Sequence, residues 1–244
     1  MLLAGVTLAL RPGAAPAAVP QGQPGPVLLI PGYGGDTSSL SVLAARLAAA
    51  GRRVTVVPLP GDGTGDLNAQ AQALAAAVRA AQGSAPSVDL VGYSAGGVVA
   101  RLYVRSYGGA GHVRRVVSLG SPQHGAVLAA SADALVPGAC VDACAQLLPG
   151  SALLRALNRG DETPAGPLWM SVWTEQDQTV RPPDSARLAG ALNVDLQQAC
   201  PGAQVSHGGL PRDPLVIGLV LSALGPAAPA APRDCPALRA AGGG

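Results

Sequence analysis

Two kinds of hydrophobic spacing alternate along the chain. Continuous apolar runs predict short buried strands at 27–30, 53–59, 88–91, 113–122, 168–173 and 193–197. Apolar residues three and four positions apart predict helices at 38–50, 66–82, just after 94, 184–191 and 213–224. Strands that alternate with helices are typical of βαβ units. The pattern therefore predicts a doubly wound, mostly parallel sheet with helices on both faces.

The length and composition fit one large domain with short appendages. The chain has 244 residues, of which 48% are hydrophobic and 12% charged. We place the α/β domain at 25–225, with an insertion at about 126–167. Residues 226–244 form a low-complexity tail rich in Pro, Ala and Gly, expected to be irregular. Residues 1–24 resemble a leader.

The charge pattern excludes two classes of partner. The net charge is only +2 and the charges are dispersed, so no nucleic acid partner is expected. No apolar stretch is long enough to span a bilayer, so stable membrane insertion is not expected either. Leu2 to Leu10 form an apolar segment, and Ala15-Pro16-Ala17 offers a small-residue cleavage site, although no basic segment precedes them. These features favour a secreted or extracytoplasmic protein.

The cysteine count supports export as well. Four cysteines, Cys140, Cys144, Cys200 and Cys235, are an even number, and their spacing is not that of a zinc site. Four cysteines allow three pairings, which sequence alone does not distinguish. Proximity favours Cys140–Cys144 as a local link, and Cys200–Cys235 would then attach the tail.

The stretch "VDLVGYSAGGVVA" places a serine between a strand and a helix. Gly92-Tyr93-Ser94-Ala95-Gly96 has the pattern G-x-S-x-G. A strand that turns into a helix within a few residues strains the central residue, exposes its hydroxyl and needs small neighbours. A glycine-rich turn with an incidental serine is the alternative. The flanking strand and helix favour Ser94 as a nucleophile.

A serine nucleophile needs a histidine base and a carboxylate. His112 precedes a strand, at the end of the sheet opposite Ser94. His124 lies just beyond a strand and is expected to shape the wall of the site. His207 follows the last strand, which suits the chain order of serine, acid and histidine in α/β-hydrolases, and it is the predicted base.

The acid should lie on a loop after a strand, between the serine and the histidine. Asp177 in "SVWTEQDQTVRP" fits best, and Glu175 is the alternative. Asp184 lies at a predicted helix start and Asp195 within a predicted strand, so a capping or surface role explains each of them.

Two backbone N–H groups should stabilise the oxyanion. Ala95 supplies one, and the turn "PGYGG" supplies the other, at Tyr33 or Gly34. That turn fails as a dinucleotide loop because Thr37 occupies the third glycine position. The stretch "GDGTGDLN" resembles the front of a calcium loop but lacks the final glutamate, so no metal site is predicted.

The segments "VLLIPGYGG", "GYSAGG", "SLGSPQHGA", "WTEQDQTVRP" and "VSHGGL" together resemble secreted bacterial lipases and esterases of the α/β-hydrolase fold, particularly the small class 2 lipases. The resemblance runs from about Val27 to Leu224. It implies cofactor-free hydrolysis of carboxylic esters by Ser94, Asp177 and His207, with Tyr33 and Ala95 as oxyanion donors. Many such lipases have His-Gly where this chain has Pro31-Gly32, which leaves the Tyr33 or Gly34 register open.

The expected substrate is a small ester or lipid with a short to medium acyl chain. The leucine-rich insertion should overhang the face that carries Ser94 and line an acyl pocket, and the alternative is a loop that merely packs on the sheet. An acyltransferase with the same triad and a non-catalytic binding protein of this fold are the alternative functions. Labelling by a fluorophosphonate, which requires an activated serine, would distinguish an enzyme from a non-catalytic binding protein.

Overall fold

A computed structural model describes residues 19–128, 140 and 142–244. Residues 1–18 of the proposed leader lie outside these ranges. So do Leu135 and Val136 of the insertion.

Six parallel strands form the central sheet, in the order β2-β1-β3-β4-β6-β8. The strands are β1 (Val27–Ile30), β2 (Val54–Val56), β3 (Val88–Tyr93), β4 (Val113–Leu119), β6 (Leu168–Trp173) and β8 (Leu192–Asp195). Every residue of β1 and β4 is buried, as expected for strands covered on both faces. Each adjacent pair runs parallel, so the carboxyl ends of all six strands meet at one edge.

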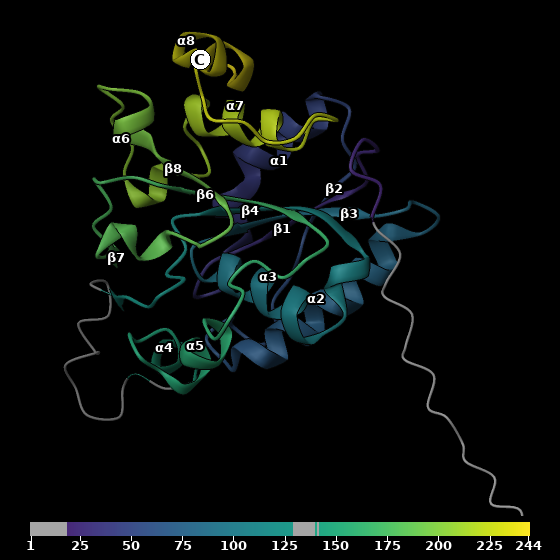
Figure 1. The fold of residues 1–244 in the computed structure, drawn as a ribbon, viewed down its shortest axis with the longest axis vertical. Coiled ribbons are helices and arrows are strands. Elements are labelled where there is room, and N and C mark those ends of the chain that lie inside the picture. Colours follow the sequence, from purple (N-terminus) through teal and green to yellow (C-terminus); the bar gives the residue numbers. More distant parts are fainter. Residues whose placement is uncertain (1–18, 129–139, 141) are drawn as a thin grey trace, which may run out of the picture.

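Helices cover the two faces of the sheet (Figure 1). One face carries α1 (Ser41–Ala49), α7 (Pro214–Ala223) and α8 (Cys235–Gly242), and the other carries α2 (Leu67–Gln82), α3 (Ala95–Ser106), α4 (Ala143–Gln146) and α5 (Ala152–Leu157). The short α6 (Leu196–Ala199) follows β8 directly. This arrangement is the α/β-hydrolase fold, as the sequence predicts.

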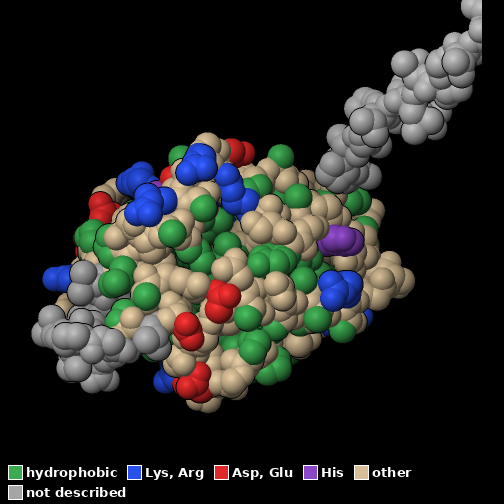
Figure 2. All heavy atoms as spheres, turned by 90° about the horizontal axis from the view of Figure 1, so that it is seen from below, with side chains coloured by type: hydrophobic (Ala, Val, Ile, Leu, Met, Phe, Trp, Pro, Cys, Tyr) green, Lys and Arg blue, Asp and Glu red, His purple; other side chains and the backbone are tan. Residues whose placement is uncertain are grey.

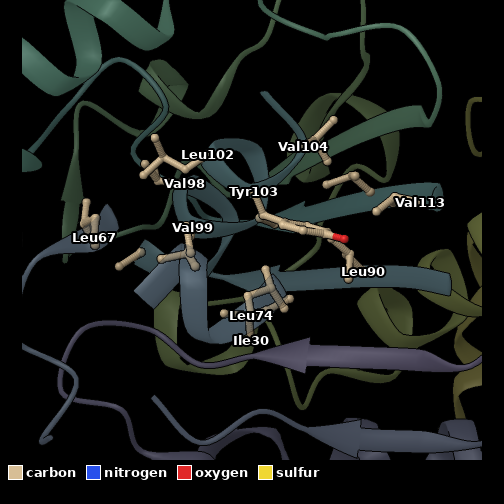
Figure 3. Close-up of a cluster of buried hydrophobic side chains, with 14 of the residues drawn as sticks. Ile30, Leu67, Leu74, Leu90, Val98, Val99, Leu102, Tyr103, Val104 and Val113 are labelled. Carbon is tan, nitrogen blue, oxygen red and sulfur yellow. The ribbon is translucent and has the colours of Figure 1, made fainter. Parts of the chain in front are cut away.

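Two hydrophobic clusters lie on opposite sides of the sheet. The cluster drawn in Figure 3 joins strand residues such as Ile30 and Leu90 to Leu74 of α2 and Val99 of α3. The other packs Leu29 and neighbouring strand residues against α1 and α7. Side chains that alternate along β1 enter opposite clusters, which explains why that strand is apolar at every position.

The insertion contains more secondary structure than the sequence indicates. Besides α4 and α5, the strand β5 (Val127–Leu128) pairs antiparallel with β7 (Val180–Arg181). Leu147 and Leu154 are 0% and 1% exposed and belong to the same cluster as α2 and α3. These two leucines therefore pack on the domain instead of facing an open cleft.

The tail is not irregular throughout, because residues 235–242 form α8. Asp234 caps this helix by accepting the N–H of Ala237 at 2.9 Å, and a proline stands in its first turn. Gly218 of α7 faces the backbone at Leu238 so closely that a Cβ would overlap it. The low-complexity composition of the tail therefore conceals a helix, which packs closely on α7.

Two disulfides are present, Cys140–Cys144 and Cys200–Cys235, in the pairing that the sequence favours. The second joins α6 to the start of α8. The tail also has anchors that the sequence does not indicate. One is a hydrogen bond from the Arg46 guanidinium to the carbonyl of Gly243, at 3.1 Å.

Some predicted element boundaries differ from the structure. The helix expected at 184–191 is only a 3-10 turn, η4 (Pro183–Ala186), because the backbone leaves the helical region at Arg187, whose φ and ψ are −59° and 140°. The helix expected from residue 38 begins as a 3-10 turn, η1 (Thr37–Leu40), before α1. The strand expected at 53–59 pairs over Val54–Val56 alone.

Buried arginines hold the amino end of the sheet. Arg114 is fully buried and donates to both carboxylate oxygens of Asp89, at 2.9 and 2.7 Å, and Arg52 reaches the same carboxylate at 2.6 Å. These two arginines and the buried Arg115 also donate to backbone carbonyls within 223–227. This arginine cluster holds residues 223–227, at and after the end of α7, against the amino end of the sheet.

Charges are sparse on the surface. Figure 2 shows a face in which hydrophobic and uncharged side chains predominate and both signs of charge occur in small groups. Within the described ranges, no helix combines the length and apolarity needed to cross a bilayer.

Candidate active site

Ser94 stands where β3 turns into α3, in a strained backbone. Its φ and ψ are 53° and −125°, a left-handed conformation that non-glycine residues adopt rarely and at a cost of about 1–3 kcal/mol. Its N–H donates to the carbonyl of Leu119 at 2.8 Å, which ties the turn to β4. The residue is 7% exposed. Strain at a serine in this position is what the G-x-S-x-G motif predicts.

The glycines of the motif are required by close approach. A Cβ on Gly92 would overlap the backbone of Gly97, and one on Gly96 would overlap the carbonyl oxygens of Ile30 and Pro31. These contacts bring the start of α3 against the ends of β3 and β1. Gly32 lies beside the serine, since a Cβ there would be 3.0 Å from the Cβ of Ser94.

Asp177 and His207 form a buried pair. His207 Nδ1 lies 2.6 Å from Asp177 Oδ2, and the side chains are 8% and 1% exposed. The other carboxylate oxygen accepts the N–H groups of Thr179 and Val180, both at 2.8 Å. The carboxylate is therefore held by hydrogen bonds on both oxygens, and it fixes the tautomer that leaves Nε2 free to accept a proton.

The pair lies at the same edge of the sheet as the serine. Leu119, which accepts the Ser94 N–H, is followed by Gly120, where a Cβ would be 3.2 Å from His207 Nδ1. Tyr93, the residue before the serine, packs its ring 5.1 Å from the imidazole centroid. The structure thus brings Ser94, Asp177 and His207 together at the carboxyl ends of β3, β4 and β6. The Ser94 hydroxyl has no hydrogen-bond partner among the described residues.

The alternative acids lie elsewhere. Glu175 is exposed, although partial desolvation of its carboxyl and next the neighbouring Asp195 raise its pKa. Asp195 caps α6 by accepting the N–H groups of Gln197 and Gln198, the capping role that the sequence suggests. Asp184 is exposed in η4.

The other two histidines occupy different places. His112 is exposed and contacts Gln82 at the opposite end of the sheet. His124 is half-exposed, pairs with Glu162 of the insertion, and helps to line a hollow of about 390 Å³ together with Ser185 and Arg187.

The backbone N–H groups of Tyr33 and Ala95, the expected oxyanion donors, differ from that of Gly34 in having no acceptor among the described residues. The Gly34 N–H is directed to the carbonyl of Gly63, at 3.4 Å. For the N–H groups of Tyr33 and Ala95, no acceptor lies within the described part of the chain. Both lie beside the serine. Ala95 follows it in the sequence, and Tyr33 follows Gly32, which packs against the Ser94 side chain.

One buried residue on the helix that follows Ser94 was not singled out from the sequence. Arg101, on α3, is fully buried and donates to the carbonyls of Leu157 and Glu162 and to the amide of Asn158, which donates in turn to the carbonyl of Gln123. An arginine on the apolar face of a predicted helix was the available hint. No cluster of three potential metal-ligating side chains occurs in residues 19–128, 140 and 142–244.

A sequence model of the palmitoyl protein thioesterase family matches residues 26–156, more than half of the chain. The chain belongs to this family. The match covers the strand–turn–helix with Ser94 and ends within the insertion. A search of curated proteins finds no significant match to this palmitoyl protein thioesterase family member.

Solved structures similar to this family member share its fold. Lipase B of Aspergillus fumigatus superposes with a TM-score of 0.75 at 22% identity, over 88% of this chain and 56% of that one. The mature lipase BlEst2 of Bacillus licheniformis gives 0.67 at 18% identity, over 88% and 96%. An extracellular α/β-hydrolase of a Paenibacillus species gives 0.56 at 15%, over 86% and 100%. The chain thus spans little more than half of the fungal lipase.

Proposed function

We propose that this chain hydrolyses carboxylic esters through an acyl-enzyme on Ser94. The observation that carries the proposal is the buried 2.6 Å contact between His207 and Asp177, beside a serine in a strained strand-to-helix turn. Family membership and the lipase fold support ester hydrolysis in general. The assignment of each catalytic role rests on the geometry.

Acylation would begin when Ser94 Oγ attacks the ester carbonyl carbon and transfers its proton to His207 Nε2. Asp177 keeps the imidazole in the required tautomer and stabilises the imidazolium that forms. The tetrahedral intermediate collapses as its bond to the leaving oxygen breaks and His207 gives the proton to that oxygen. An alcohol leaves, and the acyl group stays on Ser94.

The negative charge of the intermediate would lie on the former carbonyl oxygen. Ala95 and Tyr33 are the proposed donors, because their N–H groups flank Ser94 and have no other acceptor in the described residues. Gly34 is disfavoured, because its N–H is directed to Gly63. Fixed donors of this kind supply charge stabilisation without reorganisation during the reaction.

Deacylation repeats these steps with water as the nucleophile. His207 takes a proton from the water, hydroxide attacks the acyl carbon, and the acid leaves as Ser94 Oγ regains its proton. An added alcohol that competes with water would give a new ester instead, which is the acyltransferase alternative.

The proposed substrates are uncharged esters of short to medium acyl chains. Arg101 is the cation nearest to Ser94 along α3, and its guanidinium is occupied by the carbonyls of the insertion. It is therefore not free to bind a charged substrate. Leu147 and Leu154 lie in the core, so any acyl pocket would use other side chains of the insertion, such as the half-buried Leu148.

Thioester hydrolysis is a second candidate, favoured by the description of the matched family. The same triad can attack a thioester carbonyl, with a thiol as the leaving group. An oxygen ester and a thioester with the same acyl group would distinguish the two, by the ratio of their kcat/KM values.

The decisive experiment compares Ser94→Ala with Ser106→Ala, an exposed serine on the same helix. Ser94→Ala should lose fluorophosphonate labelling and about a million-fold in kcat for p-nitrophenyl butyrate, while Ser106→Ala keeps both. Circular dichroism checks that each variant is folded. A folded Ser94→Ala variant that retains activity would contradict the proposal.

A further inference from the structure

Tyr93 contacts the proposed base in two ways. It is the last residue of β3 and directly precedes Ser94. Its ring lies 5.1 Å from the His207 imidazole, centroid to centroid, with the planes tilted by 36°. Its hydroxyl also donates to the backbone carbonyl of His207, at 3.4 Å. One side chain thus touches both the ring and the main chain of His207.

Two further contacts of His207 restrain one edge of its ring. Asp177 holds Nδ1, and Gly120 lies against the Nδ1–Cε1 edge. A single hydrogen bond fixes a point but permits the imidazole to tilt about the Nδ1–Oδ2 line. Such a tilt would move Nε2, the atom that must accept the serine proton. An aromatic ring against the imidazole face opposes that motion.

We propose that Tyr93 is a positioning residue, whose ring and hydroxyl fix the plane and the main chain of His207 so that Nε2 stays directed at Ser94. The inference rests on the proposed function, in which His207 is the base. Because Tyr93 and Ser94 are consecutive, the end of β3 carries both the nucleophile and the surface against which its base rests. Any shift of the strand would move the two together.

The chemistry of a tyrosine suits this position. Burial, and next the nearby charge of Asp177, raises the pKa of Tyr93 to about 12, so the phenol remains a hydrogen-bond donor throughout the working range of the enzyme. The ring presents a negative π face, which attracts the imidazolium that forms during acylation. A purely aliphatic side chain would fill the space without either property.

A merely structural role is the competing explanation, since Tyr93 also packs against the hydrophobic cluster beneath α1 and α7. Two substitutions separate these roles. Tyr93→Phe keeps the ring and loses the hydroxyl, and Tyr93→Leu keeps an apolar body and loses the ring. Tyr103→Leu is the matched control, because Tyr103 is a buried tyrosine of α3 in the other cluster.

The kinetic test measures kcat and KM for p-nitrophenyl butyrate at a temperature where every variant is folded. Tyr93→Leu should lower kcat by about 10- to 100-fold with little change in KM, because the proton acceptor is misplaced and substrate binding is not. Tyr93→Phe should recover most of kcat, and Tyr103→Leu should keep kcat while lowering the melting temperature. The rate of fluorophosphonate labelling should fall in parallel with kcat.

Proton NMR tests the inference without relying on catalysis. The Nδ1 proton of His207, shared with Asp177, should give a far-downfield resonance that remains sharp in the parent, Tyr93→Phe and Tyr103→Leu. It should broaden in Tyr93→Leu as the ring gains freedom. An inactive parent with this pattern would refute the proposed function and leave the positioning role intact. An unchanged resonance and kcat in Tyr93→Leu, or an equal loss of kcat in Tyr103→Leu, would overturn the positioning role itself.

Discussion

His124 Nε2 lies 2.8 Å from Glu162 Oε1, while the other ring nitrogen of His124 faces the carbonyl of Ser185 at 3.3 Å. A neutral imidazole has one N–H, so only the protonated ring can donate to both acceptors. The second oxygen of Glu162 accepts the N–H of Ala189 at 2.7 Å. Glu162 therefore links the insertion to the loops after β4 and η4, and we call this link the Glu162 clasp.

The Glu162 clasp should depend on pH with a defined sign. Burial favours the neutral carboxyl, but the hydrogen bonds from Ala189 and His124 outweigh it and hold the pKa of Glu162 below its ordinary value. A lowered pKa in the folded state gives stability that is present above the pKa of the unfolded chain and lost as pH falls through the folded pKa. Glu162→Gln should lower the melting temperature by about 2 °C at pH 7 and by almost nothing near pH 3.

Glu175→Gln serves as the control for that experiment. Its pKa is raised by burial and by Asp195, so removing its charge should not destabilise the protein at pH 7. Differential scanning calorimetry at both pH values measures each difference. Equal losses for Glu162→Gln at pH 7 and pH 3 would show that the clasp does not depend on charge.

Asp177→Asn should lower kcat by about ten-thousand-fold, because an amide no longer selects the imidazole tautomer that leaves Nε2 unprotonated. Glu175→Gln should have little effect on kcat, since Glu175 is exposed and does not contact His207. Steady-state kinetics on both variants decides between the two acids. Loss of activity in Glu175→Gln alone would assign the role to Glu175.

His207→Ala should cost about as much activity as the loss of Ser94, on the order of a million-fold in kcat, because the two act as one unit. His124→Ala should cost less than about tenfold, since it removes only the clasp. If His124→Ala is the inactive variant, the proposed triad is wrong.

Arg101→Met and Arg105→Met compare two arginines one turn apart on α3. Arg101 is fully buried, and although burial lowers its pKa to about 10, it remains protonated at neutral pH. Its removal leaves the carbonyls of Leu157 and Glu162 without a donor and should cost about 3 kcal/mol of unfolding free energy. Arg105 donates to the carbonyls of Arg159 and Asp161 near the surface. Arg105→Met should therefore lower the unfolding free energy by less than about 1 kcal/mol. Urea denaturation measures both, and similar costs would show that burial does not set the strength of these contacts.

The two disulfides should differ in their contribution to stability. Cys200–Cys235 closes a loop of 35 residues and Cys140–Cys144 a loop of four. Chain entropy predicts losses of about 4 and 2 kcal/mol when each pair is replaced by serine. Urea denaturation measures the losses, and peptide mapping under non-reducing conditions checks the pairing. Free thiols or crossed pairs in the mapping would refute the pairing and weaken the argument for export.

The order of strands and helices was predictable because each buried strand leaves a continuous apolar run, as in Val27–Ile30. The position of Ser94 at a strand-to-helix turn was predictable from its motif. Sequence order favoured Asp177 over Glu175 as the partner of His207, and the structure places Asp177, not Glu175, against the imidazole.

Features that the sequence did not predict arise from contacts between distant parts of the chain. α8 was missed because the Pro- and Gly-rich residues around it make the whole tail look like low complexity, although α8 packs closely on α7. The contact of Tyr93 with His207 joins residues 114 positions apart. The bonds of Arg101 reach 56 to 61 positions along the chain. No local pattern encodes such distances.

The arginine cluster at the amino end of the sheet also sets an order of assembly. Arg52, Arg114 and Arg115 lie in the first half of the chain, but carbonyls within 223–227 satisfy much of their hydrogen bonding. Asp89 and the carbonyls of Gln21 and Gly25 can pair with these guanidinium groups earlier, whereas the bonds to 223–227 can form only after nearly the whole chain has been synthesised. The arginine cluster is therefore completed only when the segment after α7 packs at the amino end of the sheet.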